Sequence, residues 1–172
     1  IAAINQLKER NIKLHLYTAQ PMSFLEANGV RGAGVVYHQH VDARDVPAIL
    51  RQADILFLPL AFDTPIPDVI DTSAPGKLGE YRSVESSVLV HAPGSAFVSW
   101  YFKKERCGVV VDRSDPRLLA ESLEKLIVDK ALGAEVSERA GKVARRDFDV
   151  ERIKERFQEL IDQLILGATV GT

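Results

Sequence analysis

One short segment that is nearly all apolar constrains the fold more than any other feature. Residues 54–61 read DILFLPLA, whereas the segments on either side of them mix polar and apolar side chains. A strand that is apolar without alternation is buried on both faces, as in a parallel sheet that helices cover on both sides. We therefore expect residues 54–61 to form an interior strand of an α/β fold.

The rest of the chain alternates between strand and helix patterns. Residues 62–74 contain Pro65 and Pro67 and precede Pro75, so we expect a loop there. β-branched and apolar residues predict strands at 12–18, 34–41, 54–61, 87–92 and 108–112. Helical periodicity and start signals predict helices at 1–10, 44–52, 75–84, 95–106, 115–129, 134–146 and 150–166, and a helical turn within 20–29. This order implies right-handed βαβ units and a doubly wound parallel sheet flanked by helices.

The two ends of the sequence carry separate expectations. Residues 1–10 have the pattern of a helix already under way without an N-cap, so we expect the first strand of the domain to be missing. Residues 1–166 are then one domain cut from a longer chain, and 167–172 a flexible tail. The helix at 150–166 carries an apolar stripe that we expect to pack on the sheet: Ile153, Phe157, Leu160, Ile161, Leu164 and Ile165.

Composition excludes several classes of protein. A formal net charge of −2 argues against nucleic acid as a partner. The only cysteine, Cys107, excludes an internal disulfide and fits a reducing compartment, so we expect a cytoplasmic protein. No apolar run is long enough to span a bilayer. His38 and His40 share one face of a strand without a third ligand, so we expect no metal.

Only residues 72–93 suggest chemistry. The predicted helix in this stretch carries Lys77 and Glu80 one turn apart, close to its N-terminal end. Unpaired N–H groups and a partial positive charge make that end of a helix suitable for a phosphate. A cation directed at phosphates and a carboxylate directed at sugar hydroxyls could together hold a nucleotide.

The same stretch resembles a known family. The run P-x-K-L-x-E-Y from Pro75, followed by V-L-V-H-A-P, resembles the donor-binding half of retaining GT-B glycosyltransferases of the family 4 type. The segments ADILFLPL, CGVVVDRSDPRLLAESLEKLI and RDFDVERIKERFQELI resemble further parts of that half, in the same order. The resemblance implies a Rossmann-like domain that binds a nucleotide sugar, as substrate rather than cofactor.

The resemblance also implies roles for individual residues in donor binding. Glu80 would accept hydrogen bonds from the ribose hydroxyls, and Lys77 would meet a phosphate. The backbone N–H groups of Ser73, Ala74 and Gly76 would face the diphosphate, and Thr72 would also belong to the donor site. His40 and Val41 would lie near the nucleobase. Each role has an alternative. Glu80 could be a surface glutamate, and Lys77 could pair with it. Residues 73, 74 and 76 could form an ordinary helix cap, and His40 could be a polar strand end.

The chain departs from the family at two places. Many members carry a second glutamate, separated by seven residues from the position of Glu80 and often facing the donor sugar, and here that position holds Thr72. Where the family has Gly and then Pro, this chain has Glu85, Ser86 and Ser87. These departures keep open a degenerate donor domain that no longer binds.

The activity that the resemblance implies belongs to a longer parent protein. The parent would transfer a hexose from a nucleotide sugar to an acceptor hydroxyl with retention, in carbohydrate biosynthesis. The resemblance places the acceptor site in an N-terminal domain and leaves peripheral membrane association of the parent open. No catalytic residue is expected in these 172 residues, which alone should be inactive. A non-catalytic α/β binding module and one half of a nucleotide-sugar epimerase are the alternatives.

Overall fold

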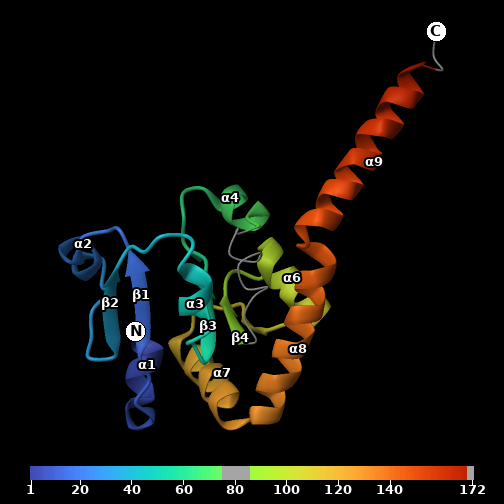
Figure 1. The fold of residues 1–172 in the computed structure, drawn as a ribbon. Helices are drawn as coiled ribbons and strands as arrows, with labels where there is room; N and C mark the ends of the chain where they lie inside the picture. Colours follow the sequence, from blue (N-terminus) through green and yellow to red (C-terminus); the bar gives the residue numbers. More distant parts are fainter. Residues whose placement is uncertain (75–85, 170–172) are drawn as a thin grey trace.

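The computed structural model describes residues 1–74 and 86–169, with side chains described through Ile165, and shows an α/β fold (Figure 1). Its strands are β1 Leu14–Thr18, β2 Val35–Gln39, β3 Ile55–Pro59, β4 Ser87–His91 and β5 Val109–Val111. Its α-helices are α1 Ala2–Gln6, α2 Met22–Ala27, α3 Val46–Leu50, α4 Pro67–Thr72, α6 Phe97–Glu105, α7 Pro116–Val128, α8 Lys130–Asp147 and α9 Val150–Thr169, and a 3-10 turn, Lys8–Arg10, follows α1. All five predicted strands are confirmed.

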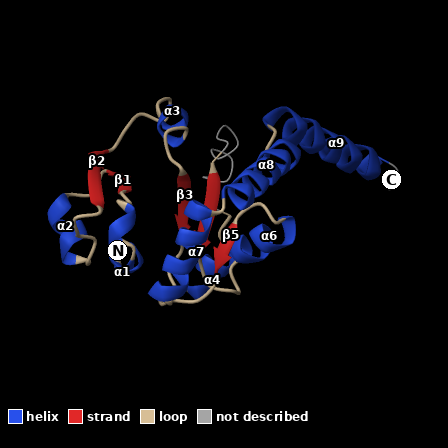
Figure 2. Ribbon diagram, turned by 90° about the horizontal axis from the view of Figure 1, so that it is seen from below, coloured by secondary structure: helices blue, strands red, loops and turns tan. Residues whose placement is uncertain are grey.

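Every strand pair is parallel, which confirms the predicted fold class. The strands nevertheless form two sheets, β1–β2 and β3–β4–β5, rather than the single sheet that we expected. Leu14 pairs with Val35 in the first sheet, and Ile55 pairs with Ser87 in the second. Both views show β1 between β2 and β3, and the break between the two sheets lies between β1 and β3 (Figures 1 and 2).

The core surrounds the three-stranded sheet on both faces. On one face, Leu58 and Val90 pack with Val98 and Phe102 of α6 and with Val143 of α8. On the other face, side chains of all three strands pack with α7 and with the start of α8; buried members of this cluster are Leu89, Val111, Leu126 and Val136. The burial of β3 and β4 on both faces explains why their sequences lack polar alternation.

Local signals fix the two helices that follow β5. The Asp115 side chain accepts a 2.8 Å hydrogen bond from the backbone N of Arg117, and Pro116 occupies the first helical position of α7. Asp129 caps α8 in the same way, accepting a 2.9 Å bond from the N of Leu132. The helices predicted at 115–129 and 134–146 are therefore confirmed, and α8 begins earlier because Asp129 serves as its cap.

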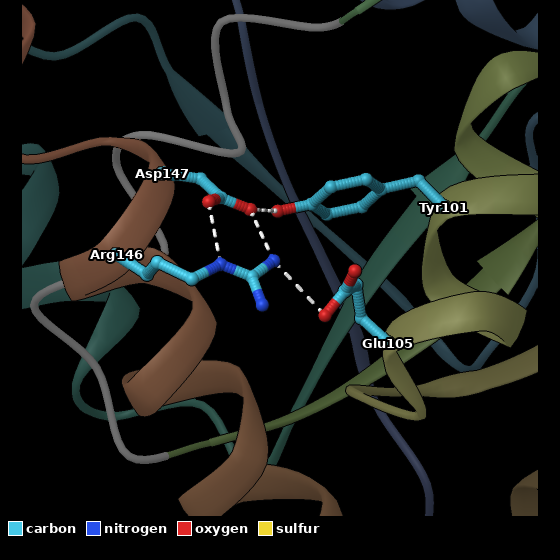
Figure 3. A network of polar contacts seen from close by, with 4 residues as sticks. All are labelled: Tyr101, Glu105, Arg146 and Asp147. Atoms are coloured by element: carbon cyan, nitrogen blue, oxygen red, sulfur yellow. Dashed lines mark hydrogen bonds and ion pairs between the residues drawn. The ribbon is translucent and has the colours of Figure 1, made fainter.

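A network of polar contacts fastens the end of α8 to α6 (Figure 3). The hydroxyl of Tyr101 donates to Asp147 at 2.7 Å, and Arg146 makes ion pairs with Asp147 at 2.7 Å and with Glu105 at 2.9 Å. The hydrogen bonds from Arg146 and Tyr101 lower the pKa of Asp147 to about 2, and burial beside Asp147 raises the pKa of Tyr101. The network therefore stabilises the ionised form of Asp147.

Two predictions about individual segments are also wrong. Residues 67–72 form α4 instead of part of a loop, because Pro67 stands near the helix start, where its missing N–H costs no hydrogen bond. The apolar stripe of α9 does not pack on the sheet: Ile153, Phe157 and Leu164 are 48%, 64% and 62% exposed, and the helix leaves the body of the fold (Figure 1). The helix also continues to Thr169, beyond its predicted end.

None of the helices described within 1–74 and 86–169 combines the length and the apolar composition that crossing a membrane requires.

Candidate functional site

A cavity lies at the carboxyl ends of β1 and β2, where ligands bind in open parallel sheets. Its volume is about 560 Å³, within the usual range for small-molecule sites. It is lined by Thr18, Ala19, Gln20, Pro21, Met22, Leu25, Tyr37, His38, Gln39 and His40. Of the two residues expected near a nucleobase, His40 lines the cavity, and Val41 is the next residue along the chain.

A tight turn after β1 forms one wall of the cavity. The backbone N of Gln20 donates to the hydroxyl of Thr18 at 3.0 Å, and Pro21 then stands at the start of α2. Helix α2 ends where expected, because Asn28 is its C-cap and Gly29 takes a φ of +77°, which glycine adopts easily. The turn leaves the exposed amide side chain of Gln20 beside the cavity.

A group of stacked rings lies on β1 and β2 beside the cavity, and within this group only His38 lines it. His38 Nε2 lies 3.0 Å from His15 Nδ1 across the β1–β2 pair, and the ring of Tyr17 stacks on His38 with centroids 4.2 Å apart. The register pairs His15 with Val36 and Tyr17 with His38, so the side chains of His15 and His38 lie on the same face of the sheet. The contacts hold the His38 ring in place, whereas His40, two residues on, is exposed.

The loop after β2 carries a compact charged pair. Arg44 donates from its backbone N and its Nε to Asp42, each at 2.9 Å. These bonds lower the pKa of Asp42 and raise that of Arg44. Both side chains are solvent-exposed, so the pair shapes the loop that follows His40 more than it adds charge to the cavity.

A second group of polar and aromatic residues lies at the carboxyl end of β4. The ring of His91 packs on Phe62 with centroids 4.6 Å apart, and its Nε2 lies 3.1 Å from the carbonyl oxygen of Arg113. Ser95, in the loop after β4, donates to Asp71 of α4 at 2.7 Å. This bond holds the C-terminal part of α4 against the loop that follows β4.

The structure places three of the residues predicted for donor binding at the end of α4. The hydroxyl of Thr72 donates to the carbonyl of Asp68 at 2.7 Å. The Ser73 side chain donates to the carbonyl of Val69, and its backbone N–H bonds to Ile70 at 3.4 Å, so both close the helix. Ala74 follows and is exposed. Their roles toward a donor stay predictions.

The other residues predicted for donor binding, Gly76, Lys77 and Glu80, lie outside the described residues, as does the helix predicted at 75–84. Gln20 and Tyr37 line the cavity and were missed by sequence reasoning. The available signal was the rule that ligands meet the ends of parallel strands, which applies to β1 as well as to β3. No three histidine, cysteine or acidic side chains gather at one point within the described ranges.

Comparison with known proteins gives fold-level matches. No protein-family model matches the sequence, and no curated protein matches it significantly. The fold matches sucrose-phosphate synthase from Thermosynechococcus elongatus, with a TM-score of 0.69 and 15% identity over 90% of this chain. It matches WaaG, a glycosyltransferase involved in lipopolysaccharide biosynthesis, with a TM-score of 0.61 and 24% identity over 86% of this chain.

Anabaena HepE, solved in complex with UDP-glucose, matches with a TM-score of 0.62 and 15% identity over 82% of this chain. The chain spans only 35% to 39% of the lengths of these three structures. At such identities the likeness concerns the fold, which is the Rossmann-like half of a GT-B architecture that the sequence resemblance implied.

Proposed function

We propose that this chain is the nucleotide-sugar-binding half of a glycosyltransferase. The observation that carries the proposal is the cavity at the ends of β1 and β2, in a fold shared with the glycosyltransferase WaaG and with HepE, which was solved in complex with UDP-glucose. The sequence resemblance at residues 75–81 is an independent reason for the same assignment. The longer parent would transfer a hexose to an acceptor hydroxyl with retention, using an acceptor domain outside these residues.

Each part of the donor has a proposed place. The base would enter the cavity beside His40 and Val41. The ribose hydroxyls would bind Glu80, and the diphosphate would meet Lys77 and the backbone N–H groups of 73, 74 and 76. The exposed position of His40 supports its part in this arrangement, because the ring can turn toward a ligand without losing a buried contact.

One observation favours a second candidate, a donor-like domain that binds a nucleotide weakly or not at all. Thr72 stands where the family often has a glutamate, and its hydroxyl is engaged with Asp68. The Ser73 N–H is likewise engaged with Ile70. Donor binding through this segment would require both groups to exchange those bonds for bonds to the ligand.

The test is a titration with UDP, GDP, ADP and their sugar conjugates, followed by backbone amide shifts. One nucleotide should shift the amides of Gln20 and His40 together with those of 76–80. Glu80→Ala should weaken that binding by about tenfold or more while the fold stays intact, since a hydrogen bond to a charged group contributes roughly 1.5–3 kcal/mol.

His15→Ala is the matched control, because His15 pairs with His38 yet does not line the cavity. It should leave the affinity within about twofold, well below the effect of losing a hydrogen bond to a charged group. If no nucleotide shifts any of these amides at millimolar concentration, the donor-binding proposal is wrong and the degenerate domain is favoured.

A further inference from the structure

Two of the chain's four histidines lie in direct contact across the β1–β2 pair. The Nδ1 atom of His15 lies 3.0 Å from the Nε2 atom of His38, and the two ring planes differ by 17° with centroids 5.1 Å apart. Rings stacked face to face at van der Waals distance do not bring two atoms this close. The two rings therefore lie edge to edge, and a nitrogen of each ring faces the other.

The strand pair fixes one of these rings and leaves the other adjustable. The register sets Tyr17 beside His38, and the Tyr17 ring stacks on the His38 ring with planes only 8° apart. His15 stands two residues before Tyr17, so its side chain leaves the sheet on the same face. The His15 ring is exposed and can turn without losing a buried contact. Both facing nitrogens can thus be directed at one point beside the sheet.

The spacing of these nitrogens suits a metal ion. Bonds from imidazole nitrogen to a divalent transition metal are about 2.0–2.1 Å long, so an ion bound to both nitrogens at their present separation would see them at about 90°. That angle is typical of the square-planar or tetragonal sites of Cu²⁺ and Ni²⁺. A tetrahedral Zn²⁺ site would require the two nitrogens to move roughly 0.3 Å further apart.

We propose that His15 and His38 bind one divalent transition-metal ion, Cu²⁺ or Ni²⁺, which links β1 to β2. In a neutral imidazole pair, one of the facing nitrogens carries a hydrogen and the other is bare. Moving that hydrogen to the second nitrogen of its own ring makes both facing nitrogens available as ligands, without a change in charge. Water would fill the remaining coordination positions. This site is separate from the proposed donor binding and does not rest on it.

The expectation of no metal considered only His38 and His40, which follow each other along one strand. The structure brings in the second ligand from the neighbouring strand instead. The ladder sets the distance between His15 and His38, whereas His40 follows the last residue of β2. Neither buried cluster found among the described residues includes a residue of β1 or β2, so a metal link would add a constraint to the less buried sheet.

The test is isothermal titration calorimetry of the whole chain with Cu²⁺, Ni²⁺ and Zn²⁺, in a buffer that does not bind metals. Cu²⁺ should bind most tightly, as the general order of divalent metal affinities predicts. Loss of even an outer-shell partner typically weakens metal binding 10–100-fold, so His15→Ala and His38→Ala should each lower the Cu²⁺ affinity by at least about tenfold. Absence of Cu²⁺ binding at about 100 µM, or His15→Ala binding Cu²⁺ as tightly as the unaltered chain, overturns the proposal.

The two remaining histidines provide matched controls. His91 lies on β4 in the other sheet, and His91→Ala should leave the Cu²⁺ affinity within about twofold, well below the loss expected for a ligand. His40→Ala should do the same. A loss in His40→Ala equal to that in His38→Ala, with none in His15→Ala, would assign the metal to one strand and refute the cross-strand site.

Electron paramagnetic resonance of the Cu²⁺ complex counts the bound nitrogens directly. The unaltered chain should show two coordinated imidazole nitrogens, and His15→Ala should show one. Saturating Ni²⁺ should also slow amide hydrogen exchange in residues 14–18 and 35–39 of the unaltered chain, but not in His15→Ala, because an ion held by both strands opposes their separation. Equal exchange with and without Ni²⁺ would show that the ion does not link the two strands.

Discussion

The two sheets of this fold use the same parallel pairing but are stabilised differently. In β4 the first four residues are buried, and apolar clusters cover both faces of its sheet. In β1 half-buried and exposed residues alternate, and Tyr17 is 37% exposed. The three-stranded sheet thus carries its own core, whereas neither buried cluster found among the described residues includes a residue of β1 or β2.

The largest difference should appear when matched leucines are truncated. Leu58→Ala removes a side chain that is 2% exposed in the larger cluster, and should lower the free energy of unfolding by about 2–5 kcal/mol. Leu16→Ala in β1 should cost about 1 kcal/mol, because Leu16 is only half-buried. Urea unfolding followed by far-UV circular dichroism measures both, and equal losses would contradict the contrast between the sheets.

Alanine substitutions at two glycines, one beside each sheet, test the same difference in packing. A Cβ at Gly108 would lie 2.8 Å from the carbonyl oxygen of Val88 and 2.7 Å from the Phe102 ring, so Gly108→Ala should cost roughly 1–3 kcal/mol. At Gly34 the nearest atom, at 2.9 Å, belongs to the Ile4 side chain, which can move. Gly34→Ala should therefore lower the midpoint of thermal unfolding less than Gly108→Ala, and a reversed order would show that β2 is packed as rigidly as β4.

The polar network on α6 and α8 should make the larger half sensitive to acid. The folded pKa of Asp147, about 2, lies below its ordinary value of 3.8, so its stabilising effect is complete above pH 4 and is lost as the pH falls from 3.8 toward 2. Asp147→Asn should remove that part of the pH dependence, and Tyr101→Phe should cost about 1 kcal/mol at neutral pH. Unfolding free energies at pH 7 and pH 3 test both, and an unchanged acid response in Asp147→Asn would count against the network.

The smallest effect is expected on α9. Phe157 and Leu164 are 64% and 62% exposed, so Phe157→Ser and Leu164→Ser should each change the unfolding free energy by less than about 0.5 kcal/mol. Differential scanning calorimetry of the two variants is sufficient. A loss as large as that of Leu58→Ala would show that α9 folds back on the body in solution.

Sequence reasoning predicted the parts of this fold that local patterns determine. The apolar runs at β3 and β4 and the Asp115–Pro116 start of α7 each have a local physical cause, and each prediction is confirmed. The two failures have long-range causes. The stripe on α9 predicts that the helix has a partner but not which one, and Pro67 fits both a loop and a helix start.

The candidate site was less predictable for the same reason. The family resemblance implied His40, and this residue does line the cavity. The pairing of His15 with His38 depends on which strands become neighbours, which the sequence of either strand does not contain. The donor-binding predictions that rest on residues 75–81 came from resemblance, so nucleotide titration is their direct test.

The buried position of Cys107 makes its rate of alkylation a measure of how often the fold opens. Cys107 is 2% exposed at the junction of α6 and β5, and burial raises the pKa of its thiol to about 11. A thiol-specific reagent can therefore modify the folded chain only as fast as that junction opens. Because the chain has no other cysteine, the rate of a single alkylation reports how often the larger half comes apart, without any label being introduced.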